Sequence, residues 1–170
     1  MLWCTDSPIL SHMFVRYFVE IPMAFPVIEE RLLRSPEAWM PGLARDAEER
    51  GELLLAEVGF GPPGARLEKQ VQIDLGVPIQ FPSKTVLPMS WRATGAEGLF
   101  PSLEADVEVA ALGPKRTQLS ISARYRPPLG LVGRAIDRAL LHRVAEATLK
   151  DFLDRVGDAL GALVGVAETP

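Results

Sequence analysis

Four successive segments in the second half of the chain alternate between apolar and polar side chains. They span residues 67–75, 85–93, 103–111 and 117–125, and their apolar side chains fall mostly on odd-numbered positions. Successive side chains of a β-strand point to opposite faces, so this period of two collects the apolar residues on one face. The pattern predicts an antiparallel sheet with one dry and one solvated face, and another element must cover the dry face.

Two earlier segments also have the composition of strands. Residues 14–21 are rich in β-branched and aromatic side chains and stop at Pro22, and residues 52–59 form a second apolar run. Gly113-Pro114 predicts a tight hairpin turn between the last two alternating segments. Six strands are therefore expected.

Three helices are expected around this sheet. Two short ones cover about 26–34 and 36–47, with Ser35 as N-cap of the second and Pro36 at its first helical position. A long one covers about 132–164, and the apolar stripe of its second half suits the dry face. Its first turns carry apolar residues on another side. Either one continuous helix rests these turns on a second surface, or a kink near residue 140 separates two helices; the residues concerned are Val132, Ile136 and Leu140.

Length and composition limit the class of protein. The 170 residues fit one domain, with residues 1–12 and 165–170 as loose ends. The net charge of −4 argues against a nucleic-acid binder, and no apolar run reaches the ~18 residues of a membrane span. A single cysteine, Cys4, excludes an intrachain disulfide, and no signal peptide is recognised, so a cytoplasmic location is expected.

The order of these elements resembles the helix-grip fold of the START-like superfamily, also called SRPBCC, which includes polyketide cyclase-like proteins. The stretch Trp39-Met40-Pro41 and the ending YRPPLGLVGRAIDRALLHRVAEATLKDFL at 125–153 carry the resemblance too. It implies an α+β fold in which a curved antiparallel sheet of six to seven strands wraps around one long C-terminal helix, with two short helices after the first strand. A seventh strand, where there is one, is either contained within Val77 to Phe81 between two prolines or merged with its neighbour. The resemblance further implies an apolar cavity between sheet and helix, and no particular activity.

The alternation selects the side chains that would face such a cavity. Mostly apolar walls with a few polar groups are typical of ligand sites, and the polar tips of Trp91 and Tyr125 would orient a ligand. A core filled by the same side chains is the alternative. The candidates are Met89, Trp91, Leu103, Val107, Leu119, Ile121 and Tyr125 from the strands and Phe152 from the last helix.

Two polar side chains are further candidates. Lys69 is the one charge on the dry face of its strand, where it either extends outward to solvent or holds an anionic group at the cavity mouth. His142 precedes Glu146 by one helical turn and is either a surface residue or a proton-transfer group. The two histidines and the cysteine lie far apart, so no metal site and no cofactor are expected.

Three other sequence patterns each have two or more interpretations or fail a structural requirement. Residues 59–64 match GxGxxG, but two prolines and a strand follow, so a dinucleotide site is rejected. Gly157, Gly161 and Gly165 either permit close backbone approach or mark a fraying helix end. Arginines that include Arg134, Arg138 and Arg143 gather early in the last helix, where they suit an anionic headgroup, an acidic partner or solvent.

The predicted function is binding or transport of a small hydrophobic or amphipathic molecule, such as a lipid, a polyketide or an aromatic compound. The alternative is a cyclase or dehydratase that acts on such a molecule in the same cavity, with Tyr125, His142 or Lys69 as acid, base or oxyanion stabiliser. A weaker alternative is an interaction module or homodimer that uses the early part of the last helix. The residues concerned are Arg134, Ile136, Arg138 and Leu140.

Overall fold

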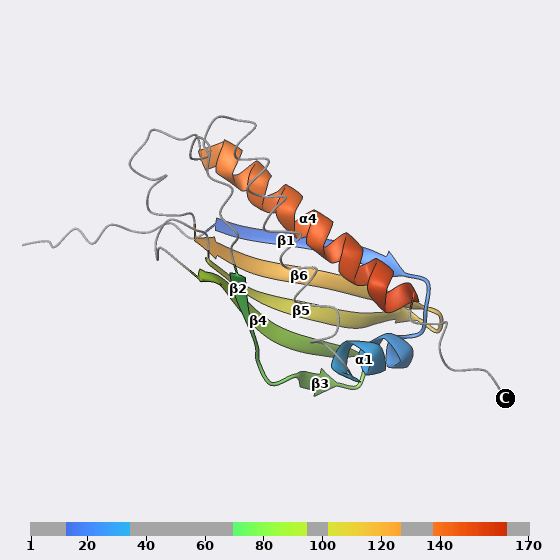
Figure 1. Cartoon of the computed structure of the whole chain (residues 1–170). Helices are drawn as coiled ribbons and strands as arrows, with labels where there is room; N and C mark the ends of the chain where they lie inside the picture. The colour runs from blue at the N-terminus through green and yellow to red at the C-terminus, as the bar shows by residue number, and fades with distance from the viewer. Residues whose placement is uncertain (1–12, 35–69, 95–101, 127–137, 163–170) are drawn as a thin grey trace, which may run out of the picture.

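The computed structural model describes residues 13–34, 70–94, 102–126 and 138–162 (Figure 1). The helix expected at 36–47, the strand expected at 52–59 and Lys69 lie outside these ranges. The elements are β1 (Met13–Ile21), α1 (Phe25–Arg34), β2 (Gln70–Leu75), β3 (Ile79–Phe81), β4 (Lys84–Thr94), β5 (Ser102–Gly113), β6 (Arg116–Arg126) and α4 (Arg138–Ala162).

The six described strands form one antiparallel sheet. Its order is β1-β6-β5-β4-β2, and β3 pairs with β4 beside β2. Trp91 of β4 lies opposite Leu103 of β5, which lies opposite Tyr125 of β6, so odd-numbered positions stay aligned across the strands. The apolar positions of neighbouring strands therefore share one face, which confirms the alternation predicted from the sequence.

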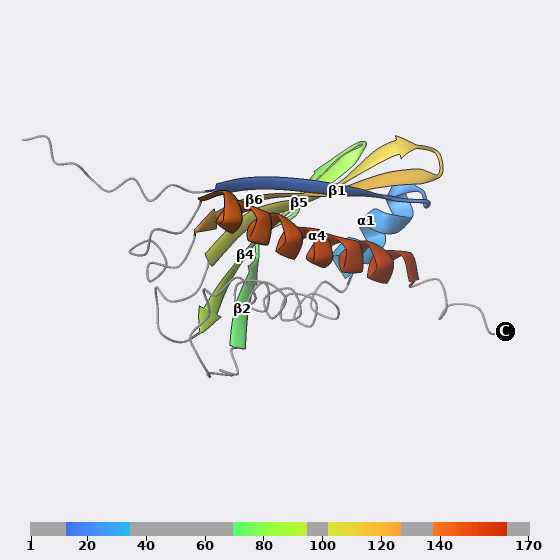
Figure 2. The ribbon, with the colours of Figure 1, turned by 90° about the horizontal axis from the view of Figure 1, so that it is seen from above.

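Both described helices cover the concave face of this curved sheet. α4 crosses the face diagonally, and α1 lies at the end where the β5–β6 hairpin turns (Figures 1 and 2). α4 is one helix from Arg138 to Ala162, and the earlier residues of the predicted long helix, 132–137, lie outside the described ranges. The core lies between helices and sheet, and its contributions from α4 are Ala145, Leu149, Phe152, Leu153, Val156 and Leu160.

A proline inside β4 marks the place where its neighbour on one side changes. β2 pairs with the second half of β4 and β3 with the first few residues. Pro88, between these two pairings, has no N–H to leave unpaired, and its carbonyl accepts the N–H of Gly76 at 2.7 Å. The strand expected within Val77 to Phe81 is thus present, although only Ile79–Phe81 form it.

Side chains of α1 and the loop before it connect this helix to the rest of the fold. The Arg31 guanidinium donates to the carbonyls of Leu160, at 2.6 Å, and Gly161, at 3.5 Å, which end α4. Glu29 accepts hydrogen bonds from the hydroxyl of Thr85 and, at 3.2 Å, from the amide of Gln80. The bonds from Arg31 satisfy carbonyls that every helix end leaves free and hold α1 against α4. The bonds to Glu29 hold α1 against the sheet.

Candidate ligand-binding site

The predicted wall residues all lie on the inner face of the sheet or on the helix above it. Each of the eight is buried, with at most 8% of its surface exposed, and that maximum belongs to Tyr125. The inward positions of the described strands carry no charged side chain. The eight residues predicted from the alternation are therefore neighbours of one apolar surface.

The strand registers arrange these side chains in rows across the sheet. Trp91, Leu103 and Tyr125 form one row, and Leu87, Val107 and Ile121 form another row four residues along the strands. The row between them consists of Met89, Ala105 and Ala123. Because the side chain of an alanine is a single carbon, the inner face is lowest where Ala105 and Ala123 meet. This part of the row is called the alanine row, or low row, below.

Trp91 and Phe152 connect the sheet to α4 beside this low row. Their ring centroids are 5.5 Å apart and the ring planes meet at 82°, an edge-to-face arrangement. Such pairs contribute about 0.5–1.5 kcal/mol beyond the area that they bury. The indole of Trp91 therefore reaches from β4 to the helix, and the two rings form one border of the alanine row.

Near its C-terminal end α4 lies against β1 and β6. A Cβ placed on Gly157 would come within 3.3 Å of Val19 Cγ2 and 3.8 Å of Leu119 Cδ2, so this glycine permits a close approach. A Cβ on Gly161 would meet nothing within 4 Å, so the close-approach interpretation is wrong there. Gly165 lies outside the described residues.

The buried hydroxyls of the inner face already have partners near α1. Thr117 Oγ1 donates to the Met23 carbonyl at 2.8 Å, and Thr85 donates to Glu29. These groups therefore hold α1 in place. Among the predicted wall residues, Trp91 and Tyr125 carry polar groups, an indole N–H and a phenol.

His142 lies on α4 away from this buried surface. Its side chain is 44% exposed, and its Nε2 lies 3.3 Å from Glu146 Oε1 in a pair one turn apart. The structure thus brings the apolar candidates together and leaves the polar candidate His142 outside the group.

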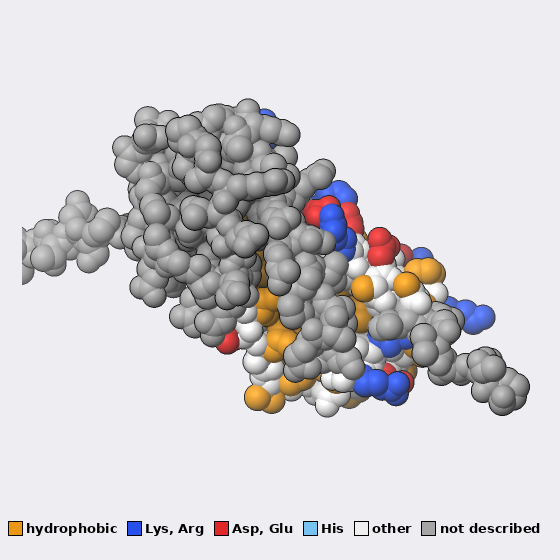
Figure 3. All heavy atoms as spheres, in the orientation of Figure 1, with side chains coloured by type: hydrophobic (Ala, Val, Ile, Leu, Met, Phe, Trp, Pro, Cys, Tyr) orange, Lys and Arg blue, Asp and Glu red, His pale blue; other side chains and the backbone are white. Residues whose placement is uncertain are grey.

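Charged side chains lie on the outward side of α4 where Figure 3 shows it. Lys150 Nζ lies 2.5 Å from Asp154 Oδ2 and 5.4 Å from the ring centre of Tyr17. The hydrogen bond to Asp154, followed by one to Tyr17, raises the pKa of the Lys150 ammonium above its ordinary value. These solvent-exposed pairs separate the apolar inner side of the helix from water.

Sequence reasoning missed three residues of this buried surface. Ala105 and Ala123 have the right parity for the inner face, but alternation does not say which residues of neighbouring strands meet. Leu153 is also fully buried on α4, although it follows Phe152 directly and lies at the border of the predicted stripe. The missing information is the strand register in the first case and the breadth of the covered helix face in the second.

No membrane-crossing helix is found in the described part of the chain, because none of its helices is long and apolar enough.

The early-helix surface expected to bind a partner lies largely outside the described ranges. Arg134 and Ile136 precede α4, and the side chains of Arg138 and Leu140 also lie outside the described part of the chain.

No protein-family model and no curated protein matches the chain. Solved structures do match. A conserved protein from Geobacillus kaustophilus is 12% identical, with 88% of this chain and 96% of that chain covered and a TM-score of 0.51. An uncharacterized protein from Bacillus thuringiensis is 10% identical, with 87% and 98% covered and a TM-score of 0.50. A START superfamily protein from Mycobacterium smegmatis is 13% identical, with 91% and 100% covered and a TM-score of 0.46.

At these identities the matches concern the fold alone. The arrangement seen in Figure 1 is an α+β helix-grip, with a curved antiparallel sheet around a C-terminal helix and a short helix after the first strand. The helix-grip fold implied by the sequence resemblance is therefore confirmed.

Proposed function

We propose that this protein binds a small hydrophobic or amphipathic molecule between the inner face of its sheet and α4. The molecule is of the lipid, polyketide or aromatic class. The observation that carries the proposal is the low alanine row at Ala105 and Ala123, bordered by the rings of Trp91, Phe152 and Tyr125.

The chemistry of this surface supports an apolar ligand. Burial of apolar area is worth about 25 cal/mol per Å² before the costs of ordering are subtracted. A ligand charge placed against uncharged walls would lose its hydration without a partner, which costs several kcal/mol. The apolar part of the ligand therefore lies against the sheet, and its polar part points to Trp91, Tyr125 or solvent.

Filling the alanine row tests the proposal. Ala105→Leu adds three carbons on the inner face, and Ala110→Leu adds the same atoms on the outer face of the same strand as a matched control. Binding is measured by titration with the neutral apolar fluorophore N-phenylnaphthylamine, and folding by chemical denaturation. Native mass spectrometry of the purified protein records any ligand that remains bound.

If there is room above the alanine row, Ala105→Leu weakens probe binding at least tenfold and lowers stability by less than about 1 kcal/mol, because the leucine occupies existing space. Ala110→Leu leaves the probe affinity unchanged. A filled core gives the opposite pair of results: the wild-type protein shows no saturable probe binding, and Ala105→Leu destabilises by about 1–3 kcal/mol through overpacking.

Two finer parts of the proposal depend on other features. Trp91→Ala is expected to weaken probe binding because it removes one border of the alanine row.

The proposed cytoplasmic location rests on the single cysteine of the sequence, and fractionation of cells that express the tagged protein tests it.

A further inference from the structure

The two edges of the sheet are built differently. On one side, β2 and β3 are short, and Gly76, Val77 and Pro78 interrupt the edge between them. Hydrophobic atoms are exposed at this edge (Figure 3), but β3 is only three residues long. On the other side, β1 runs for nine residues without proline, glycine or lysine. Short or interrupted edges discourage pairing with another chain, and β1 has neither protection.

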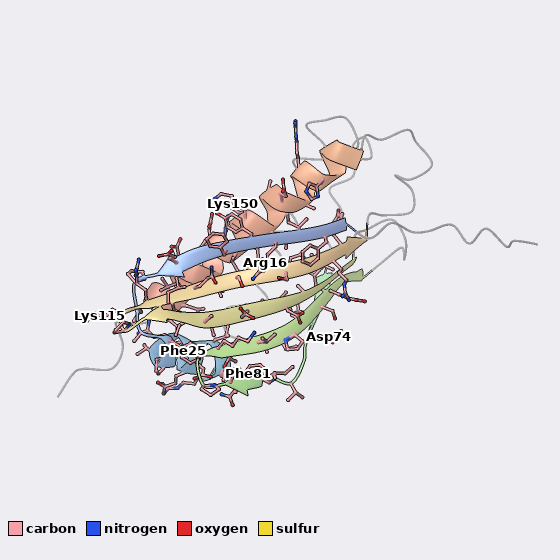
Figure 4. All side chains as sticks on the ribbon, turned by 180° about the vertical axis from the view of Figure 1, so that it is seen from behind. Arg16, Phe25, Asp74, Phe81, Lys115 and Lys150 are labelled. Carbon is pink, nitrogen blue, oxygen red and sulfur yellow. The ribbon has the colours of Figure 1, made fainter. Side chains whose placement is uncertain are left out.

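β1 pairs only with β6 among the described strands. Backbone groups of alternate residues in a strand point to opposite sides, so every second residue of β1 presents a donor and an acceptor at the outer edge. Figure 4 shows β1 as the outermost strand of the convex face, with Arg16 labelled on it. This edge is suited to receiving one more antiparallel strand.

The solvent-facing residues of β1 are two aromatic and two charged side chains. Phe14 is 60% exposed and Phe18 is 56% exposed, values that are high for phenylalanine. Arg16 and Glu20, which share that face, are exposed as well. Within the described residues no ion pair involves Arg16, whereas Glu20 Oε2 lies 3.5 Å from Arg116 Nη1.

This pattern is complementary to itself about one point. In an antiparallel pair of two β1 strands related by a two-fold axis at Phe18, residue numbers opposite each other add up to 36. Phe18 then faces Phe18 of the second copy, and Arg16 of each copy faces Glu20 of the other. Aromatic pairs and opposite charges directly across an antiparallel pair are stabilising.

Neighbouring registers match less well. An axis at Arg16 places two arginines opposite each other, which is destabilising. An axis at Tyr17 places Arg16 opposite Phe18 and Glu20 opposite Phe14, so neither charge has an opposite charge directly across. The axis at Phe18 is therefore the register that the charges favour.

The position of α4 suits the same register. Its N-terminal half projects past β1 near the start of the strand, and its C-terminal half lies over the sheet beside the end of the strand (Figures 1 and 4). An axis at Phe18 lies one residue past the middle of β1 (Met13–Ile21). The projecting halves of the two helices then lie at opposite ends of the shared strand pair.

From these observations, we propose that β1 is a dimer interface at which two copies of this chain pair edge to edge, with Phe18 on the two-fold axis and reciprocal Arg16–Glu20 pairs. The occupant of this edge is a second copy because the exposed charges of β1 complement those of the same strand.

Charge exchange tests the interface. Arg16→Glu and Glu20→Arg are made separately, together in one chain, and as a mixture of the two single variants. Asp106→Arg, an exposed change on the same convex face outside the edge, is the matched control. Sedimentation equilibrium at protein concentrations up to about 1 mM measures the mass. Thermal unfolding shows whether each variant remains folded.

The wild-type protein and Asp106→Arg are expected to sediment as dimers. Each single variant sets like charges opposite each other at two symmetric places, so its dimer is expected to weaken at least tenfold. The double variant and the equimolar mixture restore opposite charges, and both recover the dimer. A wild-type monomer at every concentration overturns the proposal. The proposal is also overturned if each single variant dimerises as strongly as the wild-type protein. The same holds if neither the double variant nor the mixture recovers the dimer.

Discussion

Gly157 offers a quantitative test of how closely α4 lies against the sheet. Replacing glycine by alanine inside a helix ordinarily stabilises a protein by about 0.5–1 kcal/mol, because alanine loses less backbone freedom on folding. At Gly157 the new Cβ would lie 3.3 Å from Val19 Cγ2, which is inside ordinary contact distance. Val19 has to shift by a few tenths of an ångström, and a β-branched side chain has little rotamer freedom to do so.

The expected result is a loss of stability in spite of the helix propensity. Overpacking of a core costs about 1–3 kcal/mol, so the net effect of Gly157→Ala is a destabilisation of about 0–2.5 kcal/mol. Gly161→Ala is the matched control in the same helix, where nothing lies within 4 Å. It is expected to stabilise by about 0.5 kcal/mol, since the position is close to the helix end. Urea denaturation with a common slope gives both free energies of unfolding.

A double-mutant cycle isolates the contact. Val19→Ala removes the methyl group that the new Cβ meets, so in that background Gly157→Ala is expected to become stabilising. The coupling free energy between the two positions is then about 1 kcal/mol or more, as for other residues in direct contact. Should Gly157→Ala stabilise the wild-type protein as much as Gly161→Ala does, with no coupling to Val19, the close approach is refuted.

Two further predictions concern contacts that connect distant parts of the chain. Arg31→Leu removes the donor to the Leu160 carbonyl and is expected to lower the free energy of unfolding by about 1–3 kcal/mol in urea denaturation. The control Arg34→Leu breaks only an exposed pair with Glu30 and changes stability by less than about 1 kcal/mol, so equal effects of the two variants would contradict a stabilising bond from Arg31 to the end of α4. Gly76→Ala places a Cβ 3.0 Å from Pro88 Cβ and is expected to lower the free energy of unfolding by about 1–3 kcal/mol. The control Gly113→Ala, whose Cβ has nothing within 4 Å, lowers it less, and a larger effect at Gly113 than at Gly76 would show that Gly76 and Pro88 are not in tight contact.

The face on which each strand residue lies could be predicted from the sequence alone. Alternation is a local property of extended backbone, so it assigns Trp91, Leu103 and Tyr125 to the inner face without knowledge of the strand pairing, and all three are buried there. The covering role of the last helix followed for the same reason, because its apolar stripe repeats with the helical period and includes Phe152.

The register and the contacts between distant segments were decided only by the tertiary structure. That Ala105 lies beside Ala123 depends on the pairing of β5 with β6, and a shift of two residues would keep every side chain on its face while removing the low row. Arg31 reaches a carbonyl 129 residues away, and no local pattern specifies such a partner. The difference is physical: side-chain direction follows from the geometry of a few bonds, whereas register and long-range hydrogen bonds follow from the packing of the whole chain.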